Sequence, residues 1–192
     1  MVYFLGMKKI LVATTNIGKK QEMSDILKTP LDFVELELDE VQSMDISYVS
    51  KRKTEEAFKI LKKPVITDDV GVFIEAWNGF PGPFAKYILE TLGNKNILKL
   101  LEKEKNRKVI VKSAVSYHDG KKVHTFVGIA EGKLAYKEKG KNGWGFDPII
   151  IPHGDKRTFG EMRPHEKNGV SHRRKALDKL KEFLESKNKK ML

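Results

Sequence analysis

The chain has 192 residues, 40% of them hydrophobic and 33% charged, and a formal net charge of +11. These apolar side chains suffice for a buried core, which excludes a disordered chain, and no stretch approaches the ~20 apolar residues of a membrane-spanning helix. The absence of cysteine excludes disulfides and thiolate zinc sites and favours a cytoplasmic protein. The basic charge suits a phosphorylated or polyanionic partner, or simply a solvated surface.

Apolar runs rich in β-branched residues predict strands near residues 9–14, 33–38, 64–67, 72–76, 109–118 and 122–135. Helical periodicity predicts helices near 19–28, 48–62, 84–104 and 171–187, the last with Ser171 as its N-cap. Asp119-Gly120 predicts a hairpin, and 137–170 is predicted to be rich in loops. We therefore predict an α/β fold with a mixed sheet in one domain over 1–192, with 1–6 an N-terminal extension and 188–192 a basic tail.

The first candidate site follows the first predicted strand. Residues 14–19, TTNIGK, combine short polar side chains and a glycine where a strand gives way to a helix. A helix N-terminus offers unpaired N–H groups and a positive dipole end, Asn16 can donate through its amide, and Lys19 carries a full charge. A phosphate site is one interpretation, and an ordinary turn capped by Asn16 or Thr14 is the other. The segment is not a Walker loop.

A pair of carboxylates, Asp68 and Asp69, ends the short strand predicted at 64–67. Adjacent residues of a strand point to opposite faces, so at most one of the two should face a given site unless the chain turns there. Such carboxylates suit Mg²⁺, or can act as a general base for a bound water. The alternative is a turn in which aspartate accepts local hydrogen bonds.

Two later segments carry aromatic and basic groups. Trp144 and Phe146, spaced by a glycine and followed by Asp147, can form a slot for a flat ring such as a base, or can pin a loop into the core. Lys167, His172 and Arg173 bring positive charge to the start of the last predicted helix, where it opposes the helix dipole. An anion or a base edge is therefore expected nearby, and a solvated basic face is the alternative.

Together these segments would accommodate a nucleoside triphosphate with Mg²⁺, and they resemble a known family. The set TTNIGK, DDVG, GFPGP, GWGFDPIIIP, TFGEM and EKNGVSHRRKAL closely resembles the inosine triphosphate pyrophosphatases over nearly all of residues 7–184. The resemblance implies two lobes around a long mixed central β-sheet, a nucleotide-binding cleft between the lobes, and a homodimer. It also implies Mg²⁺-dependent hydrolysis of the non-canonical purine nucleotides ITP, dITP and XTP to the monophosphate and pyrophosphate.

The resemblance also implies a role for individual residues. It makes Glu40 and Asp69 the metal ligands and Asp69 the proton acceptor, with Asp68 and Lys19 as further catalytic residues. The substrate-binding residues that it implies are Thr14, Thr15, Asn16, Ile17, Gly18, Lys19, Val70, Trp144, Gly145, Phe146, Asp147, Lys167, His172 and Arg173.

The sequence departs from the family pattern at three positions. Thr15 stands where glycine or serine is usual, and Val70 stands where serine or threonine is usual, so a hydroxyl expected beside Asp69 is missing. Bacterial members carry a lysine in the helix after the glutamate. Ile60 is expected at that register, with Lys59 one place away and assigned no role.

Three rival functions remain open at this stage. A pyrophosphatase of modified pyrimidine nucleotides would share the phosphate turn but should lack SHR at the last helix. A basic nucleic-acid-binding module would concentrate its charge on one face with exposed aromatics between, and no recognised nucleic-acid motif occurs. A nucleotide-binding family member with weak hydrolysis, caused by Val70, is the third. We expect a nucleoside triphosphate as partner, and neither nucleic acid nor membrane.

Overall fold

The computed structural model describes residues 10–189. The expected N-terminal extension, residues 1–6, lies outside this range, and so do residues 190–192 of the expected basic tail. Over the described range, no helix has both the length and the apolar character needed to cross a membrane.

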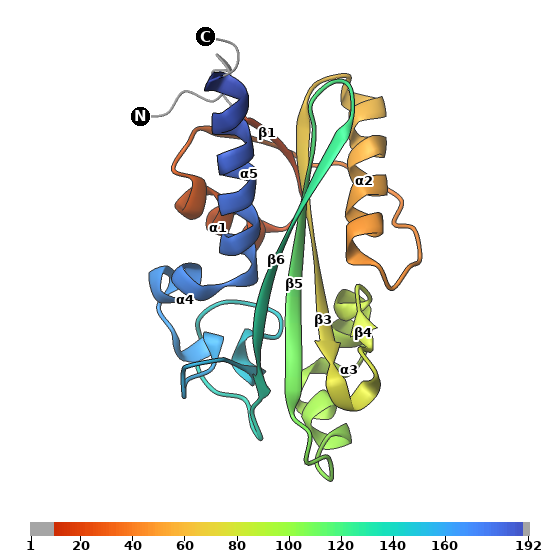
Figure 1. Cartoon of the computed structure of the whole chain (residues 1–192). Coiled ribbons are helices and arrows are strands. Elements are labelled where there is room, and N and C mark those ends of the chain that lie inside the picture. The colour runs from red at the N-terminus through yellow and green to blue at the C-terminus, as the bar shows by residue number, and fades with distance from the viewer. Residues whose placement is uncertain (1–9, 190–192) are drawn as a thin grey trace.

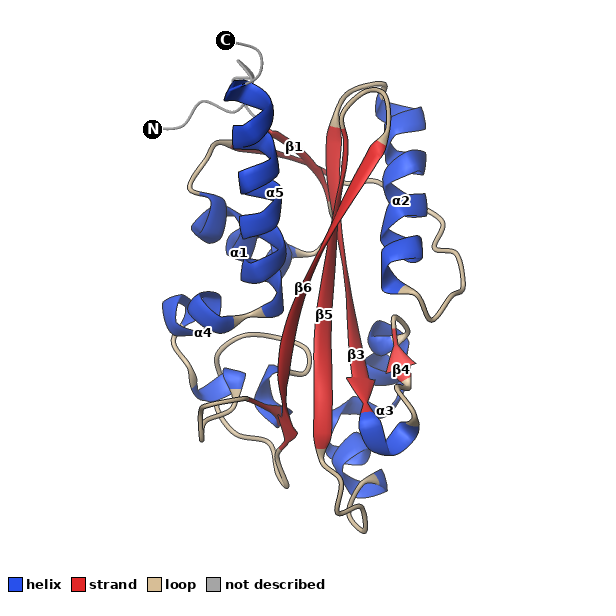
Figure 2. Cartoon of the chain, viewed as in Figure 1, coloured by secondary structure: helices blue, strands red, loops and turns tan. Residues whose placement is uncertain are grey.

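A long mixed β-sheet of seven strands runs through the molecule (Figures 1 and 2). Its order is β2-β1-β3-β5-β6-β7, and β4 pairs with β3 beside this path. β1 is parallel to β2 and β3, and the other pairings are antiparallel. The strands are β1 (Ile10–Ala13), β2 (Leu31–Val34), β3 (Val65–Ile74), β4 (Pro81–Gly82), β5 (Lys108–His118), β6 (Val123–Leu134) and β7 (Ile150–Pro152).

The predicted hairpin joins β5 to β6, and its turn is fixed by local chemistry. The Asp119 carboxylate accepts hydrogen bonds from the main-chain N–H groups of Lys121 and Lys122, both at 2.9 Å. Gly120 has a φ of 95°, a left-handed conformation that glycine adopts without steric cost. The hairpin prediction is thus confirmed.

The helices are α1 (Ile17–Leu27), α2 (Ile46–Leu61), α3 (Ala85–Leu100), α4 (Pro164–Val170) and α5 (His172–Lys189). α1 and α5 cover one side of the upper half of the sheet in Figure 1, and α2 covers the other. Side-chain caps fix where three of them begin: Asn16 caps α1, Asp45 caps α2, and the Ser171 hydroxyl accepts from the Arg174 N–H at 3.1 Å. The predicted cap of the last helix is confirmed.

Three hydrophobic clusters build the two lobes, and the smallest, with Ala13, Ala57 and Val65, packs α2 on the upper sheet. A second cluster, the core of the upper lobe, packs β1, α1 and α5 on the upper sheet and includes Met23, Ile66 and Leu180. The third, the core of the lower lobe, packs α3 and the loop region after β6 on the lower sheet and includes Ile97 and Phe159. β3, β5 and β6 run through both lobes (Figure 1). The predicted α/β fold of two lobes around a long mixed sheet is confirmed.

Several element predictions are corrected by the structure. The strands predicted at 64–67 and 72–76 are one strand, β3, because all ten of its residues pair with β5 and hold the chain extended through Asp68-Asp69. The helix predicted over 84–104 is broken at Gly93, whose φ is 69°. The region 137–170 contains β7 and α4 as well as loops.

Candidate active site

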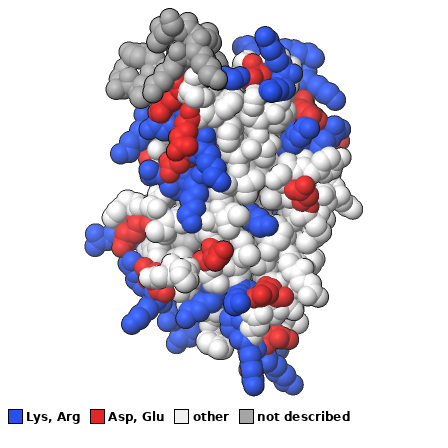
Figure 3. All heavy atoms as spheres, in the orientation of Figure 1, with Lys and Arg blue, Asp and Glu red and all other residues white. Residues whose placement is uncertain are grey.

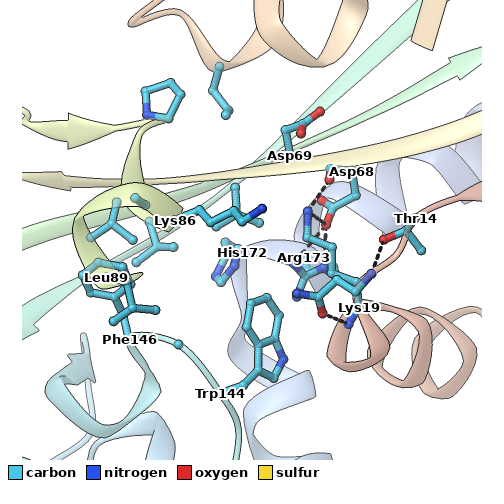
Figure 4. Close-up of a pocket in the computed structure, with 18 of the residues that line it drawn as sticks. Thr14, Lys19, Asp68, Asp69, Lys86, Leu89, Trp144, Phe146, His172 and Arg173 are labelled. Atoms are coloured by element: carbon cyan, nitrogen blue, oxygen red, sulfur yellow. Dashed lines mark hydrogen bonds and ion pairs between the residues drawn. The ribbon is translucent and has the colours of Figure 1, made fainter. Parts of the chain in front are cut away.

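The candidate site lies at a gap in the edge of the sheet. β1 pairs with β3 only at Ile66, and β4 pairs with it only at Val72 and Phe73. Between these points the edge of β3 borders a cleft of about 640 Å³. Asp68 and Asp69 point to opposite sides of the strand, but both line this cleft because it opens around the strand's edge (Figure 4). The gap, and not a turn of the chain, brings both carboxylates to one site.

The cleft is lined by all the candidate residues except Ile17 and Gly18. Lining it are Thr14, Thr15, Asn16, Lys19, Glu40, Asp68, Asp69, Val70, Trp144, Gly145, Phe146, Asp147, Lys167, His172 and Arg173. Ile17 is 79% exposed, and Gly18 lies beneath the Trp144 indole, where a Cβ atom would collide with the ring. These two residues can contribute main-chain N–H groups at the start of α1, but no side chain in the cleft.

The turn before α1 is a capped helix start that keeps donors available. The Asn16 side-chain oxygen accepts from the Lys19 N–H at 2.9 Å, and the Thr14 hydroxyl accepts from the Asn16 N–H at 3.2 Å. The amide NH₂ of Asn16 is not used by this cap. The Lys19 ammonium donates to the main-chain oxygen of Asp68 at the open edge of β3 and lies 3.4 Å from its carboxylate. The two interpretations of the turn are therefore compatible.

Asp68 is buried and fully engaged with neighbouring side chains. Its carboxylate accepts from Arg173 Nε at 3.0 Å, pairs with Arg173 Nη2 at 2.9 Å, and accepts from the Ser113 hydroxyl. Burial opposes ionisation, but Arg173 and Lys19 outweigh it and hold the pKa of Asp68 well below its usual range. Asp68 is thus a permanent anion that fixes Arg173.

Asp69 lies on the other side of β3 and faces α2 (Figure 4). Its Oδ1 accepts from the Lys53 ammonium at 2.9 Å, and the same ammonium donates to Glu40. Its Oδ2 is buried without a hydrogen-bond partner. Burial would lower the pKa of Lys53, but Asp69 and Glu40 raise it above its usual range. The Lys53 ammonium therefore lies between the carboxylates of Asp69 and Glu40.

This arrangement corrects the prediction made for α2. The helix does supply a lysine to the site, but that lysine is Lys53. The position where the family lysine was expected, Ile60, is exposed, and so is Lys59. Lys53 shares a face of α2 with the buried Val49 and Ala57, four residues away on either side. A lysine in such an apolar row was the available signal.

The residues expected to meet a base form one buried ionic group. Glu22 of α1 accepts from Lys167 at 2.6 Å, from the Trp144 indole N–H at 3.2 Å, and from Arg173. Burial opposes the ionisation of Glu22, but Arg173 and Lys167 lower its pKa. The Trp144 ring faces both cations, with Arg173 at 5.5 Å and Lys167 at 5.6 Å from its centre.

Sequence reasoning missed Glu22, although its spacing offered a signal. A residue three positions after Lys19 on the same helix lies on the same face, next to the candidate phosphate turn. It also missed Lys86 of α3, which lines the cleft and extends into it in Figure 4.

Asp147 and Val70 are placed differently from what the sequence suggested. The Asp147 carboxylate accepts from the Trp144 N–H at 2.7 Å and from Lys167 at 2.6 Å, so it fixes the loop instead of standing free for a ligand edge. Val70 shares the face of Asp68 and packs against the lower-lobe core. The expectation that a hydroxyl at position 70 would lie beside the Asp69 carboxylate is therefore wrong.

His172 is neutral in this environment. Burial, together with Arg173 and Lys167, lowers its pKa from 6.5 to about 3. Its Nδ1 is buried without a hydrogen-bond partner. His172 thus contributes a neutral imidazole to the lining of the cleft, with Nδ1 itself buried.

The carboxylates fit a hard cation, though they do not make a dense cage. Within residues 10–189, no group of three or more metal-ligating side chains is found. Glu40 and Asp69, which Lys53 bridges, supply carboxylate oxygens, and Asp69 has one oxygen unused. Two carboxylates with open positions suit Mg²⁺, which keeps several waters and takes substrate phosphate oxygens.

Comparison with known proteins identifies the family. The sequence model of the Ham1 family matches residues 10–183. The dITP/XTP pyrophosphatase of Saccharolobus solfataricus is 43% identical, over 95% of this chain and 96% of that protein, and the one of Methanopyrus kandleri is 42% identical, over 91% and 95%. The Ham1 protein of Staphylococcus aureus has the same fold, with a TM-score of 0.81 and 26% identity over 94% of this chain and all of that one. This chain belongs to the Ham1 family.

Proposed function

We propose that this protein hydrolyses the non-canonical purine nucleoside triphosphates ITP, dITP and XTP to the monophosphate and pyrophosphate, in a reaction that depends on Mg²⁺. One observation carries the proposal. A single cleft is bordered by a helix N-terminus with Lys19, by the carboxylates Glu40 and Asp69, and by an aromatic and basic group around Trp144. These suit, respectively, phosphates, a metal with a bound water, and a base.

In the proposed reaction, Asp69 accepts a proton from a water whose oxygen adds to the α-phosphorus. The bond between that phosphorus and the bridging oxygen breaks, and pyrophosphate leaves with this oxygen. Lys53 donates a hydrogen bond to Asp69 Oδ1 and orients the carboxylate, and Lys19 with the N–H groups of α1 neutralises phosphate charge. Glu40 and Asp69 would hold Mg²⁺, which when bound neutralises phosphate oxygens and polarises the reacting phosphate.

Selection of the purine base is proposed to rest on hydrogen-bond donors of the protein. Arg173 and Lys167 are held by Asp68, Glu22 and Asp147, so they present N–H groups in a fixed, buried place. A 6-oxo purine accepts hydrogen bonds from such groups, whereas the 6-amino group of adenine would leave a buried donor unpaired. The relatives named dITP/XTP pyrophosphatase act on bases of the 6-oxo kind, which supports this assignment.

Measurement of pyrophosphate release tests the proposal. We expect turnover of dITP, ITP and XTP with Mg²⁺, loss of turnover when the metal is chelated, and much lower kcat/KM for dATP. Release of orthophosphate instead of pyrophosphate, or equal turnover of dATP, would contradict it. Tight nucleotide binding without turnover would instead identify a binding protein.

The rival nucleic-acid-binding function gains no support from the face of the molecule that Figure 3 shows. On the face shown in Figure 3, Lys and Arg side chains lie interspersed with Asp and Glu and do not merge into one basic stripe. A nucleic-acid groove needs concentrated charge along a track.

We further propose a homodimer in the cytoplasm. Ile110 and Ile129 are 37% and 41% exposed on neighbouring strands, β5 and β6, which supports a partner on this face of the sheet. The lack of cysteine supports a reducing compartment. Light scattering on protein eluted from a size-exclusion column measures the molar mass and so tests the dimer. We expect a dimer for wild type and a monomer for Ile129→Lys, and a monomeric wild type would refute the proposal.

A further inference from the structure

The segment Gly143–Asp147, here named the base loop, is anchored at its end by Phe146, which is buried in the lower-lobe core, whereas its first part, residues 143–145, is exposed or half-buried. Gly143 and Gly145 have φ values of 73° and 67°, and Trp144 between them is 36% exposed. The Trp144 N–H and C=O groups both bond within the loop, to the Asp147 side chain and the Asp147 N–H. In the described chain, one main-chain hydrogen bond of residues 143–145 reaches another element, and it comes from Asn94 of α3.

Asn94 donates from its Nδ2 to the Gly145 carbonyl at 2.9 Å, across 51 positions of sequence. The break at Gly93 directly precedes it, with φ 69° and ψ 164°, so Asn94 opens the second part of α3. A Cβ atom at Gly93 would meet nothing within 4 Å. This glycine is therefore needed for its backbone conformation and not for space, and that conformation directs the side chain that follows it.

The side-chain oxygen of Asn94 indicates that the NH₂ group, and not the oxygen, accounts for an asparagine at this position. Its Oδ1 is buried and has no hydrogen-bond partner. A buried acceptor without a partner is destabilising, and an apolar side chain at this half-buried position would avoid that cost. Asn94 touches neither the ionic group around Glu22 nor the carboxylates at β3, so its contact with Gly145 is the one that bears on the site.

We propose that Asn94 is a positioning residue that holds the base loop, and through it Trp144, against the base of the substrate. The Gly145 carbonyl belongs to the peptide that joins Gly145 to Phe146, one peptide beyond Trp144, so holding it restricts the backbone rotation of Gly145 through which Trp144 would shift. The indole reaches across the cleft to Glu22 and lies beside Arg173 and Lys167. A loosened loop would weaken contacts with the base and leave the phosphate end untouched. The proposal rests on the proposed function, since it assumes a purine nucleotide in the cleft.

The experiment compares Asn94→Ala and Asn94→Asp with wild type. Asn94→Asp keeps the shape but sets a carboxylate against a carbonyl. Asn96→Ala is the matched control, because the amide of this exposed asparagine on the same helix donates to the Leu92 carbonyl within α3. For both Asn94 variants we expect the KM for dITP to rise about three- to tenfold, the range of one hydrogen bond, with kcat within about twofold. Inhibition by inorganic tripolyphosphate, which has no base, should be unchanged.

A second readout does not depend on turnover. In a Trp77→Phe background Trp144 is the sole tryptophan, and its acrylamide quenching should increase in Asn94→Ala and stay at the wild-type level in Asn96→Ala. Unchanged quenching would overturn the proposal, as would equal losses for dITP and tripolyphosphate or a fall in kcat alone. If wild type hydrolyses no purine triphosphate, the proposed function fails, whereas quenching still decides whether Asn94 holds the loop.

Discussion

Asp68 and Asp69 are adjacent carboxylates whose surroundings differ. Asp68 is fixed by Arg173 and Ser113 on one side of β3, and it also holds the Lys19 ammonium. Asp69 has one oxygen on Lys53 and the other unused, on the side of the cleft that Glu40 also borders. The alternation of a β-strand thus places two identical groups in different surroundings: Asp68 is bound to Arg173, and Asp69 keeps one oxygen without a hydrogen-bond partner, as the proposed catalytic role requires.

This difference predicts opposite effects for two matched substitutions. Asp69→Asn should lower kcat by about 10²–10⁴-fold, the usual cost of losing a general base, with little change in Tm. Asp68→Asn should instead lower Tm, because it leaves the buried Arg173 short of a charged partner. Pyrophosphate release and thermal melts measure both; near-normal turnover of Asp69→Asn at saturating Mg²⁺ would remove Asp69 from its proposed role.

Lys53 gives a second residue-level prediction. Its ammonium lies between Glu40 and Asp69, so Lys53→Met should reduce kcat/KM for dITP by at least about tenfold, since a charged hydrogen bond contributes roughly 1.5–3 kcal/mol. Lys59→Met, on the exposed face of the same helix, should stay within about twofold. Equal effects would mean that lysines act here only through a diffuse positive field.

At the scale of elements, the sequence predicts what local pattern controls. The long hairpin, the start of α5 and the capped turn before α1 follow from Asp119-Gly120, Ser171 and Asn16, whose effects are confined to a few neighbours. The continuity of β3 does not follow, because DDVG carries turn-forming residues that pairing with β5 overrides. Lys53 and Glu22 were missed for a related reason. Each is one charged residue on a helix face, and only tertiary packing shows what it meets.

The contacts of Glu22 connect three helices, so its removal is a prediction about how elements are held together. It joins α1 to Lys167 of α4 and Arg173 of α5. Glu22→Gln keeps the shape but leaves two buried cations with less compensation, a change that typically costs about 3–5 kcal/mol when a buried pair is broken. At about 2–4 °C per kcal/mol for a chain of this size, Tm should fall by roughly 6–20 °C.

The control for that variant is Glu35→Gln. Glu35, which follows β2, forms a solvent-exposed pair with Lys20 of α1, and exposed pairs contribute little to stability. A Tm for Glu22→Gln as high as that of Glu35→Gln would show that the buried ionic group does not hold these helices together.

At the scale of the whole molecule, the two lobes have separate apolar cores, whereas the cleft between them is lined with ionic groups. Arg173, Lys167 and His172 are all nearly inaccessible to solvent. The charges of Arg173 and Lys167 are balanced by Glu22, Asp68 and Asp147, and His172 is neutral. Such a region is sensitive to protonation in a way that the apolar cores are not. We therefore expect the cleft to contribute to the response of the whole fold to acid, together with the buried His118 at the end of β5, whose pKa is also lowered by burial.

His172 is the cleft residue whose protonation should begin that response. Its pKa is about 3 in the folded protein and 6.5 in the unfolded chain, so the unfolded state binds a proton first as the pH falls. The stability that neutral His172 contributes is complete above about pH 6.5 and is lost between about pH 6.5 and 3, by at most ~1.4 kcal/mol per pH unit. The carboxylate of Asp68, whose folded pKa is also lowered, adds a loss only below about pH 4.

We expect Tm to fall from pH 7 to 5 in wild type and to fall less in His172→Asn, while His165→Asn, at an exposed site, follows wild type. Parallel Tm profiles for wild type and His172→Asn over this range would show that His172 titrates normally and that acid acts elsewhere.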